Sequence, residues 1–290
     1  MELLKIFQTH PCFFIATVAV VGLMVGSFLN VVIYRLPVMM QRNWRQECNE
    51  YLELPAPEPP DDPLTLSLPT SRCGQCYTPI KPQHNIPVLS YLFLRGKCAY
   101  CHASYAARYP LVELFTGIIS AIVAWYFGYS AAAFFALILS WSLIALSGID
   151  IDHQLLPDNI ILPLLWLGLF LSVFNVFTDS HSSIIGAIAG YLSLWIVFQL
   201  FKLATGKEGM GFGDFKLLAL FGAWLGWQYL PLIILLSSLV GAIVGVSMVV
   251  FCKHDHQKPI PFGPYLAVAG WIALLWGNEI NQLYLGAVGL

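Results

Sequence analysis

Eight apolar stretches, separated by polar segments, dominate the hydrophobic pattern of this chain. A helix needs about 20 apolar residues to cross a bilayer, and no ten-residue alternation typical of a membrane β-barrel is visible. The sixth and eighth stretches are short and would depend on neighbouring helices or tilt. The pattern predicts an all-α polytopic membrane protein with about eight transmembrane helices, at residues 12–33, 111–127, 131–149, 160–177, 184–204, 215–226, 230–252 and 264–276.

Composition excludes the main alternative, a soluble globular enzyme. Of the 290 residues, 58% are hydrophobic and only 10% are charged, whereas ordinary soluble domains are about 25% charged. The first apolar stretch is longer than the core of a secretion signal and ends without a small-residue cleavage site, so we expect it to be retained.

The positive charges orient the predicted helices. If eight spans alternate sides, thirteen of the 14 Lys and Arg residues fall on one face and Lys5 alone falls on the other. Positively charged loops favour the cytoplasm. We therefore expect both termini to be extracytoplasmic, and residues 35–109, the only long polar region, to be a cytosolic insert.

The second half of this insert contains two CxxC pairs. Cys73 and Cys76 are followed, after 21 intervening residues, by Cys98 and Cys101, a spacing typical of tetrahedral zinc held by four sulfurs. Two disulfides or a redox-active pair are the alternatives, but a cytosolic location disfavours them. We expect a structural zinc, because four sulfurs leave no open position for water. The first half of the insert, rich in proline and acidic residues, predicts a loop.

Four aspartates lie at cytosolic ends of predicted helices. Asp150, Asp152 and Asp158 cluster after the third apolar stretch, and Asp214 follows Gly211-Phe-Gly at the start of the sixth. Asp158 follows a proline and precedes an apolar run, which favours a helix N-cap. Asp214 could also be a cap, although the glycines before it allow close approach of another chain segment.

A pair of carboxylates at one membrane depth would have a chemical use. Two acids held together share one proton, which provides a base and an acid in one site. Such a pair can activate water against a peptide carbonyl. Asp150 and Asp152 would point to different faces of a helix, so at most one is expected to meet Asp214. A carboxylate-dependent transporter and a membrane docking factor remain alternatives.

The chain resembles the type IV prepilin peptidases, which are bifunctional leader peptidases and N-methyltransferases. The resemblance covers nearly the whole chain and includes the two CxxC pairs, Asp150 through Asp158 and Gly211-Phe-Gly-Asp214. It also includes Gly26-Ser-Phe-Leu-Asn30 running into Tyr34-Arg-Leu-Pro37, residues 87–97, Arg108-Tyr-Pro-Leu-Val-Glu113 and Pro261-Phe-Gly-Pro264.

This resemblance implies a specific activity. The substrates would be type IV prepilins and type II secretion pseudopilins, cleaved at the cytosolic face of a bacterial inner membrane. The new N-terminus would then be methylated from S-adenosylmethionine. By position, Asp150 and Asp214 correspond to the catalytic aspartates and the four CxxC cysteines to the family's tetrad. Membrane lipids would surround the protein, nucleic acid is not expected, and the oligomeric state stays open.

The methyl-transfer site has only candidates, which lie in family motifs near the cytosolic face: Asn30, Arg35, Gly96 and Glu113. No Rossmann glycine fingerprint supports them. Asn30 and Glu113 could instead bond neighbouring helices, Arg35 could be a topological anchor, and Gly96 could serve a turn. Lys216 could tune the aspartates or anchor its helix. We expect residues 1–34 to be the first transmembrane helix, 35–109 the methyltransferase-associated zinc insert, and 110–290 a seven-helix peptidase domain.

Overall fold

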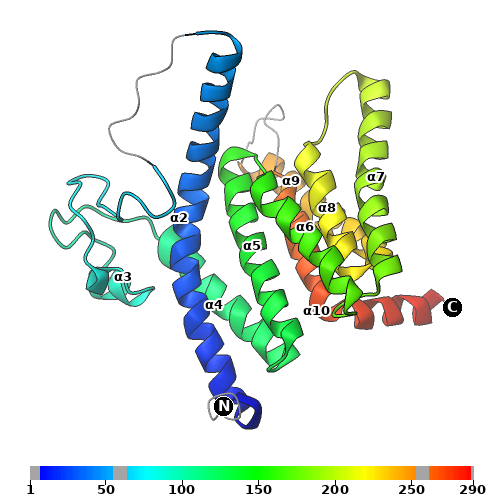
Figure 1. Ribbon diagram of the computed structural model, residues 1–290, viewed down its shortest axis with the longest axis horizontal. Coiled ribbons are helices and arrows are strands. Elements are labelled where there is room, and N and C mark those ends of the chain that lie inside the picture. The colour runs from blue at the N-terminus through cyan, green and yellow to red at the C-terminus, as the bar shows by residue number, and fades with distance from the viewer. Residues whose placement is uncertain (1–6, 55–63, 253–260, 289–290) are drawn as a thin grey trace. The chain divides into compact units, whose positions relative to one another are not determined.

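The protein is all-helical in the computed structural model, which describes residues 7–54, 64–252 and 261–288 (Figure 1). Only two isolated β-bridges occur among the described residues, so the predicted all-α class is confirmed. The helices are α2 (Pro11–Tyr51), α3 (Leu89–Phe93), α4 (Arg108–Phe127), α5 (Ala131–His153), α6 (Asp158–Val173), α7 (Ser180–Thr205), α8 (Phe212–Leu225), α9 (Leu230–Cys252) and α10 (Gly263–Val288), with short 3-10 turns at Pro82–His84 and Trp227–Tyr229.

Each predicted apolar stretch overlaps one helix, but the count of eight crossings is not confirmed. Among the described residues, five helices are long and apolar enough to span a membrane, namely Pro11–Tyr51, Arg108–Phe127, Ala131–His153, Ser180–Thr205 and Trp227–Ser247. Helices α6 and α8 have 16 and 14 residues. At 1.5 Å per residue, both are shorter than a typical hydrocarbon layer.

The chain forms two compact units, an N-terminal unit (Met1–Trp141) and a C-terminal unit (Ser142–Leu290). In the N-terminal unit, α2 packs along α4. Small residues line this contact, because a Cβ on Gly22 or Gly26 would collide with Ser120 or Glu113 of α4, as is common where membrane helices approach closely. These units are defined by packing and do not test the predicted functional boundaries at residues 34 and 109, which stay a prediction.

Helix α2 corrects one expectation, because it continues through the start of the polar insert as far as Tyr51. The predicted loop is therefore wrong for residues 35–51. Pro37 lies inside the helix, where it removes one backbone donor. The following residues contain no glycine and are mostly good helix formers, and Gln46 Nε2 donates to Glu50 Oε1 at 2.9 Å across one turn. Residues 55–63, which carry most of the prolines of the predicted loop, lie outside the described residues.

The C-terminal unit is built around α8. Every residue from Asp214 to Leu225 except Lys216 is buried, and α6, α7 and α10 pack against this helix. Trp224 Nε1 donates to the Leu164 carbonyl of α6 at 2.8 Å, and Ser183 Oγ of α7 donates to the Ala223 carbonyl at 2.6 Å. Because other helices surround α8, this helix can be buried and apolar without being long enough to cross a membrane. Its first turn holds Asp214 inside the unit.

Candidate functional site

Two buried carboxylates lie together in the C-terminal unit. Asp150 is in the last turn of α5 and Asp214 is in the first turn of α8, and their residues are only 5% and 6% exposed. Their charges interact electrostatically. Asp152, two residues after Asp150, is exposed, because successive helical positions point in different directions. Of the two aspartates that end α5, the structure thus brings Asp150 to Asp214.

A backbone donor from a distant part of the chain holds Asp150. The Gly263 N–H, at the start of α10, donates to Asp150 Oδ2 at 3.0 Å. A Cβ at residue 263 would lie 2.7 Å from that oxygen, and one at Gly213 would lie 2.6 Å from Leu156 Cβ. Leu156 also lies within 3.2 Å of the Gly263 position. Its side chain therefore packs against both glycines, and neither position has room for a larger residue.

Asp214 keeps one carboxylate oxygen without a partner. Within the described part of the chain, Oδ1 is the buried side-chain oxygen that has no hydrogen bond. A buried polar atom without a partner costs free energy, so such atoms are rare in cores and mark functional positions. The arrangement offers one fixed and one uncommitted carboxyl group, which suits proton exchange with a bound molecule.

The sequence predicted that Asp158 caps its helix, and this prediction is wrong. Pro157 occupies the N-cap position of α6, no side chain caps the helix, and Asp158 is its first residue. The Asp158 carboxylate instead accepts from Lys216 Nζ at 2.8 and 2.7 Å. Lys216, in the first turns of α8, is therefore engaged in tying α6 to α8 close to Asp214.

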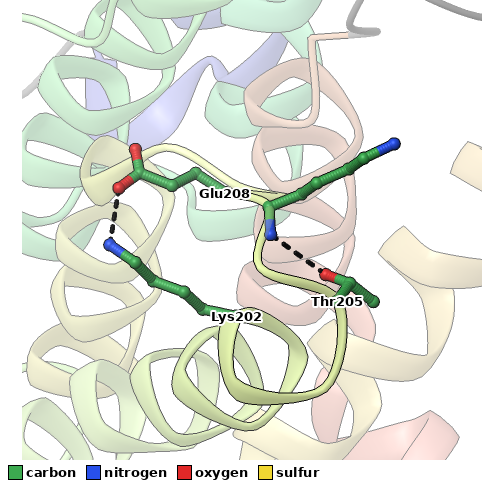
Figure 2. A network of polar contacts seen from close by, with 4 residues as sticks. Lys202, Thr205 and Glu208 are labelled. Carbon is green, nitrogen blue, oxygen red and sulfur yellow. Dashed lines mark hydrogen bonds and ion pairs between the residues drawn. The ribbon is translucent and has the colours of Figure 1, made fainter.

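The connection that leads into Asp214 has its own polar network (Figure 2). Lys202, in the last turn of α7, forms an ion pair with Glu208 at 2.7 Å, and the Lys207 N–H donates to Thr205 Oγ1 at 3.2 Å. Both groups are exposed, so each contact contributes little free energy. Together they shape the turn before the glycine-rich segment.

The four predicted cysteine ligands converge in the N-terminal unit. All four sulfurs, those of Cys73, Cys76, Cys98 and Cys101, lie within 4.8 Å of one another, with Cys73–Cys101 at 3.7 Å and Cys76–Cys98 at 4.0 Å. These separations exceed a disulfide bond of about 2.05 Å. They match the edge of about 3.8 Å in a tetrahedron with zinc–sulfur bonds of about 2.3 Å. The four-sulfur donor set therefore fits a structural metal ion.

The two CxxC turns have the same backbone design. The Cys73 N–H donates to the Thr78 carbonyl at 3.0 Å, and the Cys98 N–H donates to the Ala103 carbonyl at 2.8 Å. The residue that follows each pair has a positive φ, 55° at Tyr77 and 58° at His102. This repeated turn presents two sulfurs from each pair to a common centre.

Local electrostatics prepares the cysteines for a cation. The backbone N–H groups of Cys101 and Tyr100, with the Tyr105 hydroxyl, lower the pKa of Cys98 to about 6 despite its burial. At Cys101 the Ala103 N–H lowers the pKa, but burial and the three neighbouring sulfurs outweigh it and raise the pKa to about 11. Four thiolates thus repel one another unless a positive ion compensates them.

The four methyl-transfer candidates all border one cavity. It measures about 540 Å³ and lies between α2, the two CxxC turns and the start of α4, within the N-terminal unit. Asn30, Arg35, Gly96 and Glu113 line it. This volume is in the range of small-molecule sites.

These candidates also make structural contacts. Asn30 Nδ2 donates to the Tyr109 carbonyl of α4 at 3.1 Å, and Arg35 Nη2 donates to the Pro69 carbonyl at 2.7 Å. Glu113 Oε2 accepts from the Val88 N–H at 2.7 Å. Gly96 has a φ of 68° in a turn. The structural roles considered for Asn30, Glu113 and Gly96 thus correspond to contacts or a turn that the structure contains. Such contacts do not prevent these residues from lining the cavity.

Sequence reasoning missed two features. Gly263 was noticed only within the Pro261-Phe-Gly-Pro264 motif, and a contact with an aspartate 113 residues earlier has no local signal. The cavity is also lined by tyrosines from α2, α3, α4 and the second CxxC turn, namely Tyr34, Tyr91, Tyr105 and Tyr109. Their spacing has no periodicity, so only the tertiary structure identifies them.

Comparison with known proteins gives a consistent result over the whole chain. Residues 20–127 match the bacterial peptidase A24 N-terminal domain, and residues 137–246 match the type IV leader peptidase family. No solved structure matched the chain.

Full-length relatives share about half of their residues with this chain. A prepilin leader peptidase/N-methyltransferase from Stutzerimonas stutzeri is 56% identical over 98% of both chains. One from Pseudomonas aeruginosa is 56% identical over 100% of this chain and 99% of its own length. One from Aeromonas salmonicida is 50% identical over 99% of both.

We predict that the Asp158–Lys216 pair contributes measurably to stability. Each single change, Asp158→Lys or Lys216→Asp, should lower the midpoint of thermal unfolding in detergent, because like charges then face each other. The double variant should recover most of the loss. The pair is partly exposed, so the coupling should be about 0.5–1 kcal/mol in a double-mutant cycle. Additive effects in the cycle would contradict the pairing.

Proposed function

Because the chain belongs to the type IV leader peptidase family, we propose that it removes the leader from type IV prepilins and type II secretion pseudopilins and then N-methylates the new terminus. The observation that carries the peptidase half is the buried pair of Asp150 and Asp214, of which one is fixed by a backbone donor and the other has an unpartnered oxygen. The names of the full-length relatives support both activities.

In the proposed peptidase reaction, each of the two aspartates carries out one proton transfer. The Gly263 N–H stabilises a negative charge on Asp150, so we assign Asp150 as the general base that takes a proton from water. The water oxygen then bonds to the peptide carbonyl carbon. Asp214, with no donor on Oδ1, supplies the proton to the leaving nitrogen as the carbon–nitrogen bond breaks. No covalent enzyme intermediate is needed.

The proposed location of this reaction is the cytosolic face of a bacterial inner membrane. The lysine and arginine distribution supports this orientation, and both aspartates occupy helix ends. A substrate with a basic leader and an apolar helix would keep its leader at that surface and its helix in lipid. The bond between the two parts would then reach the aspartates.

For methyl transfer, we propose the cavity of the N-terminal unit as the site of S-adenosylmethionine. Asn30, Arg35, Gly96 and Glu113 would form part of its wall. When bound, the cofactor would supply the methyl group for the amine, and these residues would orient it. The family's N-terminal domain match covers this cavity, which supports assigning methylation to residues 35–109 and peptidase chemistry to 110–290.

We propose zinc as the ion of Cys73, Cys76, Cys98 and Cys101. With four sulfur ligands it would crosslink the two CxxC turns and take no part in either reaction. Because these turns form part of the cavity wall, the ion would support the methyl-donor site indirectly. A transporter or a docking factor would not require this combination of an aspartate pair and a walled cavity.

The first prediction of the proposed function concerns the aspartate pair. Asp150→Asn and Asp214→Asn should each abolish leader removal, with a loss of at least about 10³-fold, because the pair can no longer exchange a proton. Asp152→Asn, two residues from Asp150 but exposed, is the matched control and should retain activity. Mass spectrometry of a prepilin incubated with the purified proteins measures the outcome. Normal cleavage by a folded Asp214→Asn variant would rule out the mechanism.

The second prediction concerns the metal. Cys73→Ser should reduce zinc from about one ion per chain to a small fraction of that, and should lower the unfolding temperature, because the ion closes two distant turns. Cys48→Ser is a suitable control, since Cys48 lies outside the cluster. Metal analysis by mass spectrometry and thermal unfolding would check this. A Cys73→Ser protein with full zinc content would contradict the assignment.

The third prediction separates the two activities. Gly96→Ala places a Cβ about 2.9 Å from the Tyr91 ring at a φ of 68°, so the cavity wall must shift. Methylation should fall by about tenfold or more, whereas cleavage in the C-terminal unit should be unchanged. A variant that loses both activities equally would count against the cavity as the methyl-donor site.

A further inference from the structure

Helix α3 has two unlike faces. Ser90, Tyr91 and Leu94 line the cavity. On the other side Ile86, Leu89, Leu92 and Phe93 are 46%, 51%, 64% and 83% exposed. The i+3 and i+4 spacing of Leu89, Leu92 and Phe93 places these three on one face of α3. Together with Ile86, which lies just before the helix, we call them the α3 patch. A water-soluble insert rarely exposes four neighbouring large apolar residues, so the α3 patch indicates a partner.

The start of α3 is tied to a membrane helix. The Val88 N–H donates to Glu113 Oε2 at 2.7 Å, and Glu113 lies in the second turn of α4. Since Glu113 is five residues beyond Arg108, the first residue of α4, this contact lies about 7.5 Å along the helix. In the same part of α4, Leu111, Leu114 and Phe115 are exposed and apolar, as expected for lipid-facing side chains. Helix α3 therefore begins at the depth where α4 enters lipid.

The backbone at this contact is strained. Val88 has φ 60° and ψ −48°, and the Leu89 N–H donates to the Pro87 carbonyl at 2.6 Å, which closes a three-residue turn. A β-branched residue adopts a positive φ only when its surroundings impose it. The bond from Glu113 is one such constraint, so the orientation of the α3 patch is fixed by a specific interaction rather than by chance.

Charge identifies the partner. Residues 64–112 contain five basic residues and no Asp or Glu: Arg72, Lys81, Arg95, Lys97 and Arg108. Arg95 and Lys97, just after the α3 patch, are exposed. Apolar side chains flanked by basic ones at membrane depth are the pattern of a segment that inserts into an anionic bilayer surface.

We propose that the α3 patch inserts into the anionic lipid surface next to α4 and acts as a membrane anchor for the insert. Glu113 is then a positioning residue that sets the direction of the patch. The anchor would hold the cavity, which the opposite face of α3 lines, close to the membrane surface. This last step rests on the proposed function, because a newly formed N-terminus would emerge at that surface.

Lipid contact can be measured without any enzymatic activity. A fluorescent amino acid replaces Phe93 in the full-length protein, and the protein is placed in vesicles of phosphatidylcholine and phosphatidylglycerol with or without brominated acyl chains. The matched control carries the same probe at Tyr51, which is 87% exposed but lies at the far end of α2. Quenching at residue 93 and not at 51 is expected. Equal fluorescence at residue 93 in both vesicles, or self-association instead of quenching, would overturn the proposal.

The consequence for activity is tested with Leu92→Ser combined with Phe93→Ser, and Tyr51→Ser as control. Methylation of a vesicle-embedded prepilin should fall by about tenfold, while zinc content and methylation of a short soluble peptide should stay unchanged. Unaltered methylation in vesicles would overturn the anchor. If the unmodified protein methylates neither substrate, the proposed function fails, and the quenching experiment still decides the lipid contact.

Discussion

The structure of the C-terminal unit depends on keeping two carboxylates out of water. Burying such groups is costly unless they are compensated, and the compensation is unequal here. Asp150 receives the Gly263 N–H, while Asp214 Oδ1 receives no hydrogen bond from the described residues. The helices around α8 and the packing of Leu156 against two glycines hold this unequal pair in place. The unpartnered oxygen of Asp214 thus lowers the stability of the fold at the position where we propose the chemistry.

The N-terminal unit is stabilised differently, because its long insert contributes few apolar residues to a core. Four sulfurs, hydrogen bonds from Arg35 to the segment around Pro69, and the bond from Val88 to Glu113 supply the order that packing does not. Each of these contacts joins residues far apart in the sequence. The cavity wall is therefore a product of a few crosslinks, and its shape depends on each of them.

The sequence was most informative where chemistry imposes spacing or periodicity. The apolar stretches located every long helix, and the CxxC spacing brought four sulfurs together as expected. The prediction failed at Asp158, whose carboxylate binds Lys216, 58 residues away, instead of capping its own helix. It also failed at residues 35–51, where the polar, proline-rich insert predicted a loop but α2 continues. Its count of eight crossings is not confirmed, since an apolar stretch such as that of α8 is covered by other helices. Tertiary contacts decided each of these cases.

The 113-residue separation between Asp150 and Gly263 has a consequence for biosynthesis. Helix α5 leaves the ribosome long before the donor that holds its carboxylate exists. A carboxylate in the middle of a nascent membrane helix would oppose insertion during this interval, but Asp150 is in the last turn of α5 and can stay hydrated at the surface. Burial of the aspartate would then be among the last events of assembly. An incompletely synthesised chain would lack the Gly263 donor, so its Asp150 carboxylate would not yet be held as in the finished protein.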